Sequence, residues 1–141
     1  MTPENITRVR TTWALVTPIA DTAASMFYER LFTLDPSLRP LFVGTDLAPQ
    51  RRKLVQAIAL VVAALDRLDE VVPTLEALGR RHSGYGVNDA HYDTVGQALI
   101  DTLERGLGAA WNAETASAWT QAYGIIAGTM RRAQATAPIA A

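Results

Sequence analysis

Apolar residues recur along this chain at spacings of three and four, the period of an amphipathic helix. The first such set is Ile6, Val9, Trp13 and Val16. Thr2-Pro3-Glu4 precedes it as a typical helix start, so we predict a first helix that ends at about Val16. A second helix is expected over about residues 19–34, because Pro18 suits its first turn and the Asp35-Pro36 pair ends it.

The same period continues through the middle of the chain. The second helix places one set of residues on a shared face: Ala24, Tyr28, Leu31 and Phe32. A short helical turn over residues 37–41 and a loop over residues 42–46 follow. A long helix is then predicted from Pro49 to about Leu68, with one face made of Gln50, Leu54, Ala57, Ile58 and Val61.

Three further helices complete the pattern. A short one begins near Pro73, ends before Gly84 and Gly86, and carries Leu75, Leu78 and His82 on one face. A long one is capped by Asn88 or Asp89, closed by Gly106 and Gly108, and turns these residues inward: Tyr92, Val95, Leu99 and Leu103. The last begins at Asn112 or Glu114 and carries Trp119, Tyr123, Ile126 and Met130. From about residue 136 we expect a flexible tail.

No segment alternates with a period of two residues, so the pattern predicts an all-α fold of about six to eight helices. Neither repeats nor a linker divide the sequence. We therefore expect residues 1–141 to form a single domain.

Composition excludes several classes of function. With a net charge of −1 and a pI near 6.1, the chain has no basic footprint for nucleic acid. It contains no cysteine, which rules out disulfides and fits a reducing compartment. The longest apolar run, Ala57 to Leu65, is too short to span a membrane, and the N-terminus has no signal-peptide pattern. We expect a cytoplasmic protein without nucleic-acid or membrane partners.

Few side chains here suggest chemistry. There is no glycine-rich phosphate loop and no cysteine nucleophile, and His82 and His91 are too far apart to share a helix face. On its apolar face, His82 is either a hydrogen-bonded core residue or a metal ligand, and the pattern alone leaves both open. Any demanding chemistry would have to come from a bound cofactor.

Three blocks of sequence carry a resemblance to bacterial globins, and they follow one another in the family's order. They are MFYERLFTLDPSLRPLF (26–42), LGRRHSGYGVNDAHYDTVGQAL (78–99) and AWTQAYGIIAGTM (118–130). The chain is most similar to single-domain globins of the Hell's Gate globin I type and to the globin domain of flavohaemoglobins. The resemblance implies a globin fold, a three-on-three helical sandwich, and haem b (iron protoporphyrin IX) as cofactor.

The resemblance also implies roles for residues on both sides of the haem. His82 corresponds to the proximal iron ligand, with the carbonyl of Leu78 as the expected acceptor for its other ring nitrogen. On the distal side, the matching residues are Tyr28, Gln50 and Leu54, with Phe42 packed on the haem face. Two alternatives stay open, since Phe42 also suits a plain core aromatic and Gln50 an exposed first-turn glutamine.

Tyr92 matches a tyrosine that contacts the proximal histidine in flavohaemoglobins, where a late glutamate accompanies it. Here the corresponding position is close to Thr136 and no acid follows Glu114, so this hydrogen-bond relay is incomplete. The alternative is a core tyrosine whose hydroxyl donates to a backbone carbonyl. We expect His91 to be exposed or bonded near the helix cap, without a functional role.

Other cofactor contacts follow from position. Lys53 and Arg81 would reach the haem propionates or simply face water. Further apolar contacts are expected from Val87, Val95 and Ile126.

Four functions remain open. The first is reversible dioxygen binding at a five-coordinate iron with a Tyr/Gln distal pocket. The second is an enzyme, a nitric-oxide dioxygenase or nitrite reductase, which would need a separate reductase because the sequence contains no flavin domain. A sensor globin would need an output domain, and a cofactor-free helical bundle is the remaining alternative. The expected small-molecule partners are dioxygen, nitric oxide and carbon monoxide.

Overall fold

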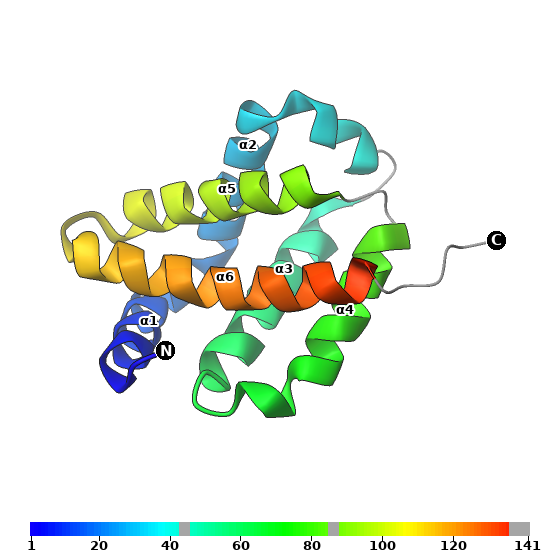
Figure 1. Ribbon diagram of the computed structural model, residues 1–141. Helices are drawn as coiled ribbons and strands as arrows, with labels where there is room; N and C mark the ends of the chain where they lie inside the picture. The colour runs from blue at the N-terminus through cyan, green and yellow to red at the C-terminus, as the bar shows by residue number, and fades with distance from the viewer. Residues whose placement is uncertain (43–45, 85–87, 136–141) are drawn as a thin grey trace.

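The computed structural model describes residues 1–42, 46–84 and 88–135, although not the side chains of residues 82–84 and 135. Within these ranges the chain forms helices and no strands (Figure 1). The α-helices are α1 (Pro3–Val16), α2 (Ala20–Leu34), α3 (Leu47–Ala63), α4 (Val72–Gly84), α5 (Asp89–Leu107) and α6 (Ala113–Ala135). Short 3₁₀ helices join them: η1 (Thr17–Ile19), η2 (Pro36–Phe42), η3 (Leu68–Glu70) and η4 (Gly108–Ala110). The predicted all-α class is confirmed.

Several predicted helix starts are confirmed by their caps. The Thr2 hydroxyl accepts a hydrogen bond from the backbone N–H of Asn5 at the start of α1. At α5 the cap is Asn88 rather than Asp89, and it forms a reciprocal capping box with His91. The side chain of Asn112 accepts from the backbone N–H of Thr115 in the first turn of α6.

The predicted bounds of α3 are wrong at both ends. The helix begins at Leu47, two residues before Pro49, because the Asp46 carboxylate accepts from the N–H of Ala48 and caps it. It ends at Ala63 and not near Leu68. There, the guanidinium of Arg10 on α1 donates to the carbonyl oxygens of Val62 and Ala63, at 3.1 and 2.9 Å. These are terminal carbonyls that the helix itself leaves without a partner.

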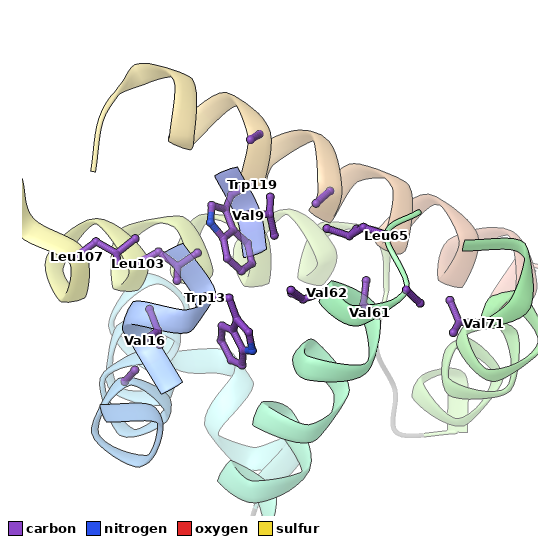
Figure 2. Packing of buried hydrophobic residues seen from close by; sticks show 14 of the residues in the cluster. Val9, Trp13, Val16, Val61, Val62, Leu65, Val71, Leu103, Leu107 and Trp119 are labelled. Atoms are coloured by element: carbon purple, nitrogen blue, oxygen red, sulfur yellow. The ribbon is translucent and has the colours of Figure 1, made fainter. Parts of the chain in front are cut away.

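The main hydrophobic core lies where α1, α3, α5 and α6 meet (Figure 2). Trp13 on α1 and Trp119 on α6 pack with ring centroids 6.3 Å apart. The indole N–H of Trp119 donates to the hydroxyl of buried Thr12 at 2.8 Å, which satisfies the polar atom inside an apolar core. This bond ties the first helix to the last.

Helix α6 is the element on which the others are arranged. In Figure 1, α5 and α6 run side by side across the molecule, with α4 against the C-terminal half of α6 and α2 crossing α5. Two glycines permit the closest of these approaches. Gly79 on α4 faces the backbone of Met130 on α6, and Gly96 on α5 faces the ring of Tyr123. The middle of α4 is therefore held close to α6.

No helix in the described ranges has the length and apolarity needed to cross a lipid bilayer. The predicted flexible tail concerns residues 136–141, which lie outside the described residues.

Candidate functional site

The predicted site residues fall into two hydrophobic clusters that share α5. What we call the α2 cluster consists of Phe27, Tyr28, Leu31, Phe32, Leu38 and Ala98, with Phe42, Leu47, Leu54, Val95 and Leu99 packed against it. The α6 cluster consists of Tyr92, Ala127 and Met130, with Leu78, Tyr123 and Ile126 packed against it. Val95 thus belongs to one cluster, and Tyr92, one turn earlier on α5, belongs to the other.

Tyr28 lies at the centre of the α2 cluster, because the apolar face of α2 turns it inward. Only 6% of its surface is exposed. Its ring packs edge-on against Phe27 and Phe42, with centroid distances of 5.1 and 5.7 Å. Phe42 also packs edge-on against Phe32 at 5.4 Å, although it is the last residue of η2 and remains partly exposed. Both predicted aromatics therefore belong to one packed group.

The hydroxyl of Tyr28 points toward the first turn of α3. Burial raises the pKa of Tyr28 above its usual value, while a hydrogen bond from Gln50 and the charge of Arg51 act in the opposite direction. The phenol is therefore protonated at neutral pH and can donate. Gln50 is half-buried, so it differs from an ordinary exposed first-turn glutamine. Arg51 is fixed by Asp21 on α2, whose carboxylate accepts from Nε at 3.2 Å.

The α6 cluster holds Tyr92 in a different hydrogen-bond arrangement from the one expected. Its hydroxyl donates to the side-chain oxygen of Gln134 at 2.7 Å, so the acceptor is neither an acid nor a backbone carbonyl. Tyr123 instead bonds a carbonyl, since its hydroxyl donates to the Tyr92 oxygen at 2.6 Å. Burial raises the pKa of both phenols. Thr136, the position compared earlier with the family's glutamate, lies outside the described residues.

Sequence reasoning missed Gln134. The one pattern that pointed to it is its spacing of four from Met130, which continues the inward face of the last helix. It brings a neutral amide to the place beside Tyr92, where the resemblance led us to look for a carboxylate.

The remaining predicted residues are placed as follows. His82 lies in the last turn of α4, three residues after Gly79, but its side chain lies outside the described part of the structure, as does all of Val87. Lys53 and Arg81 are exposed. His91 completes the capping box of α5, because its Nδ1 accepts from the N–H of Asn88 at 3.0 Å, and this explains it without a role in the site.

The side chains at the site fit a largely apolar cofactor. Five of the residues predicted to contact it are apolar and only partly buried by protein, whereas their neighbours Phe27, Leu31, Ala98 and Ala127 are buried. The partly buried set is Phe42, Leu54, Leu78, Val95 and Ile126. Covering such surface with an apolar group is favourable, and exposed cations such as Lys53 and Arg81 suit a group with carboxylates at its edge.

Comparison with known proteins points in one direction. A model of the globin family matches residues 25–130. A flavohemoprotein of Bacillus subtilis (strain 168) is 30% identical over 121 residues, which cover 84% of this chain and 30% of that protein. The chain thus spans under a third of that relative's length. A solved bacterial globin from Campylobacter jejuni superposes with a TM-score of 0.83 at 22% identity, covering 95% of this chain and 96% of that one.

Proposed function

This chain belongs to the globin family, whose members bind haem, and we propose that it holds haem b through His82 and binds dioxygen reversibly at a five-coordinate iron. The observation that supports this most directly is the buried, protonated hydroxyl of Tyr28 with Gln50 beside it. A buried phenol requires a hydrogen-bond partner, and a polarised gas molecule is a good acceptor.

Bound haem supplies an iron centre that ligates a diatomic gas and releases it again. The residues of this chain then decide how long the gas stays. Tyr28 donates to the negatively polarised end of the ligand, and Gln50 orients that hydroxyl from the first turn of α3. Leu54 and Phe42 line the same side with apolar surface and exclude water from it.

On the other side, His82 is the proposed metal ligand. Helix α4 presents it from a turn that Gly79 and Met130 hold against α6. The carbonyl of Leu78 is the proposed acceptor for the second ring nitrogen, which fixes the tautomer. Tyr92 contributes an oxygen lone pair, because its proton is already given to the amide oxygen of Gln134. Apolar contacts from Leu78, Val95, Ile126 and Val87 complete the proposed haem site.

Nitric-oxide dioxygenation or nitrite reduction is the second candidate, and the similarity to a flavohemoprotein favours it. The same Tyr28–Gln50 pair serves both functions, since each requires a polar ligand to be held near the iron. This activity requires an electron donor in addition to the matched region, so we propose a separate reductase. We place the protein in the cytoplasm and treat residues 1–141 as one globin domain with a flexible end.

An absorption spectrum of the purified protein, supplemented with haemin, tests the proposal. A Soret band that shifts when the reduced protein is exposed to dioxygen, and back when the gas is removed, is the expected result. Carbon monoxide should displace the dioxygen and give its own spectrum. Absence of a Soret band at equimolar haemin would show that this chain is a helical bundle without the cofactor.

A further inference from the structure

Positive charge is distributed unevenly over this chain, and the excess lies next to the proposed haem site. Residues 36–63 and 77–88 contain six of the 13 Lys and Arg residues but one of the 14 Asp and Glu residues. That acid, Asp46, is engaged in capping α3. A protein with a net charge of −1 thus concentrates cations on the segments that carry Gln50, Leu54 and His82.

Elsewhere most arginines are paired with acids. Arg10, Arg30, Arg67 and Arg131 each form an ion pair, with nitrogen–oxygen distances between 2.7 and 3.2 Å for their shortest contacts. In contrast, five exposed cations next to the site have no ion pair with any described residue: Arg39, Arg52, Lys53, Arg80 and Arg81. Arg39 packs over the ring of Phe32 at 4.7 Å, which leaves its charge unneutralised.

These five cations come from η2, the first half of α3 and the C-terminal part of α4. These segments lie toward one end of the molecule, on the right in Figure 1. We call the five residues the basic rim. A haem group carries two propionates, so at most two of the five are neutralised by the cofactor. At least three positive charges then remain for another partner.

We propose that the basic rim docks an acidic electron-transfer protein that returns one electron to the haem iron. The inference rests on the second candidate function, nitric-oxide dioxygenation or nitrite reduction, which needs an electron donor in addition to the matched globin region. In the exchange, a reduced flavin loses one electron and ferric iron gains it to become ferrous, with no bond made or broken. Complementary charge speeds such encounters and orients the partners, although the acidic remainder of this chain repels an acidic donor. The rim therefore selects the face at which the donor arrives.

Flavodoxin, a small acidic flavoprotein, is a suitable probe. We expect the haem-loaded protein to bind flavodoxin weakly at low salt. The affinity should fall by about tenfold when the salt concentration is raised from roughly 20 to 200 mM. The double variant Arg52→Glu/Arg80→Glu should lose about tenfold in affinity, and Arg52→Gln/Arg80→Gln a smaller factor. The matched control is Arg105→Glu, which changes an exposed cation in the last turn of α5 that forms no ion pair with the described residues.

The electron-transfer rate gives a second readout. Stopped-flow mixing of reduced flavodoxin with the ferric protein should be slowed in the rim variants and unchanged in Arg105→Glu. Equal affinity in all three variants would overturn the proposal, as would binding to anionic phospholipid vesicles without binding to flavodoxin. Failure of the proposed function is distinguishable, because a protein without a Soret band reveals itself before any flavodoxin is added.

Discussion

Gly79 on α4 lies directly against the backbone of Met130 on α6. A Cβ atom at Gly79 would sit 2.5 Å from the Met130 carbonyl oxygen and 2.9 Å from its Cα. Both atoms belong to a helix backbone and cannot rotate away as the end of a side chain can. Since His82 follows three residues later, this contact sets how closely the proposed iron ligand's helix approaches α6.

Replacing Gly79 with alanine should therefore destabilise the protein by about 1–3 kcal/mol, as overpacking of a tight contact does. It should also weaken haem retention, because α4 must shift away from α6. Denaturant unfolding with and without haemin measures both effects. The control is Gly124→Ala on the exposed face of α6, where an added methyl meets nothing within 4 Å. That change should stabilise by about 0.5–1 kcal/mol through helix propensity. Equal stability of Gly79→Ala and the parent would contradict the packing argument.

Tyr28→Phe should accelerate dioxygen release. The variant keeps the aromatic contacts with Phe27 and Phe42 and removes only the hydroxyl. A charge-assisted hydrogen bond of roughly 1.5–3 kcal/mol would be lost, which corresponds to about a ten- to hundred-fold faster off-rate. Gln50→Leu should act in the same direction but less strongly, and carbon monoxide release should change little. Stopped-flow displacement measures these rates. An off-rate for Tyr28→Phe within twofold of the parent would make Tyr28 a packing residue only.

The two histidines should behave oppositely. His82→Ala should lose stable haem binding, which the Soret absorbance after gel filtration would measure. His91→Ala should retain haem, but it should unfold more easily by about 1 kcal/mol, because the N–H of Asn88 loses its acceptor at the start of α5. If both variants keep the parent spectrum, His82 is not the ligand.

Stability should fall steeply in alkaline solution. Burial raises the pKa of Tyr28, Tyr92 and Tyr123 above the value of about 10 that tyrosine has in the unfolded chain. Above about pH 10 the unfolded state therefore loses protons that the folded state keeps, and the free energy of unfolding decreases as pH rises. Urea unfolding between pH 8 and 11, in buffers of equal ionic strength, should show the fall, with a shallower slope in Tyr123→Phe. A flat profile in the parent would refute this linkage.

Reaction with nitric oxide distinguishes reversible dioxygen binding from catalytic nitric-oxide dioxygenation. The oxygenated protein should consume nitric oxide once, rapidly, and stop in the ferric form, because the electron that restores ferrous iron is proposed to come from a separate reductase. An electrode records the consumption. Continued consumption with reduced nicotinamide alone, without an added reductase, would show that the chain does not need the proposed partner.

Local sequence patterns predicted the helices well, because helix caps and apolar faces depend on residues that are close together in the sequence. The sequence placed the start of α5 at Asn88 or Asp89, and the structure has it at Asn88, which forms a capping box with His91 three residues later. The end of α3 could not be predicted in this way, because the apolar run to Leu65 continues beyond it. At the observed end, the guanidinium of Arg10, more than 50 positions earlier, donates to the carbonyl oxygens of Val62 and Ala63. Only the tertiary fold brings these groups together.

The site likewise contains residues that the sequence predicted and residues that only the tertiary fold reveals. The resemblance led to Tyr28, Gln50 and Phe42, and the fold brings these three side chains together around the Tyr28 ring. The partner of Tyr92 was missed, since Gln134 is 42 residues away and a hydrogen bond across two helices leaves no local pattern. The need for glycine at position 79 was missed for the same reason. It depends on the backbone of Met130, which lies opposite on another helix.

The hydrogen bond from Trp119 to Thr12 and the packing of Trp119 against Trp13 have an optical consequence. Two of the chain's three tryptophans, Trp13 and Trp119, are buried where its first and last helices pack together. Haem absorbs at their emission wavelengths, so a bound haem quenches them by energy transfer, and unfolding shifts their emission to the red. The intrinsic tryptophan fluorescence can therefore report both cofactor binding, through its intensity, and the packing of α1 on α6, through its wavelength, without an added label.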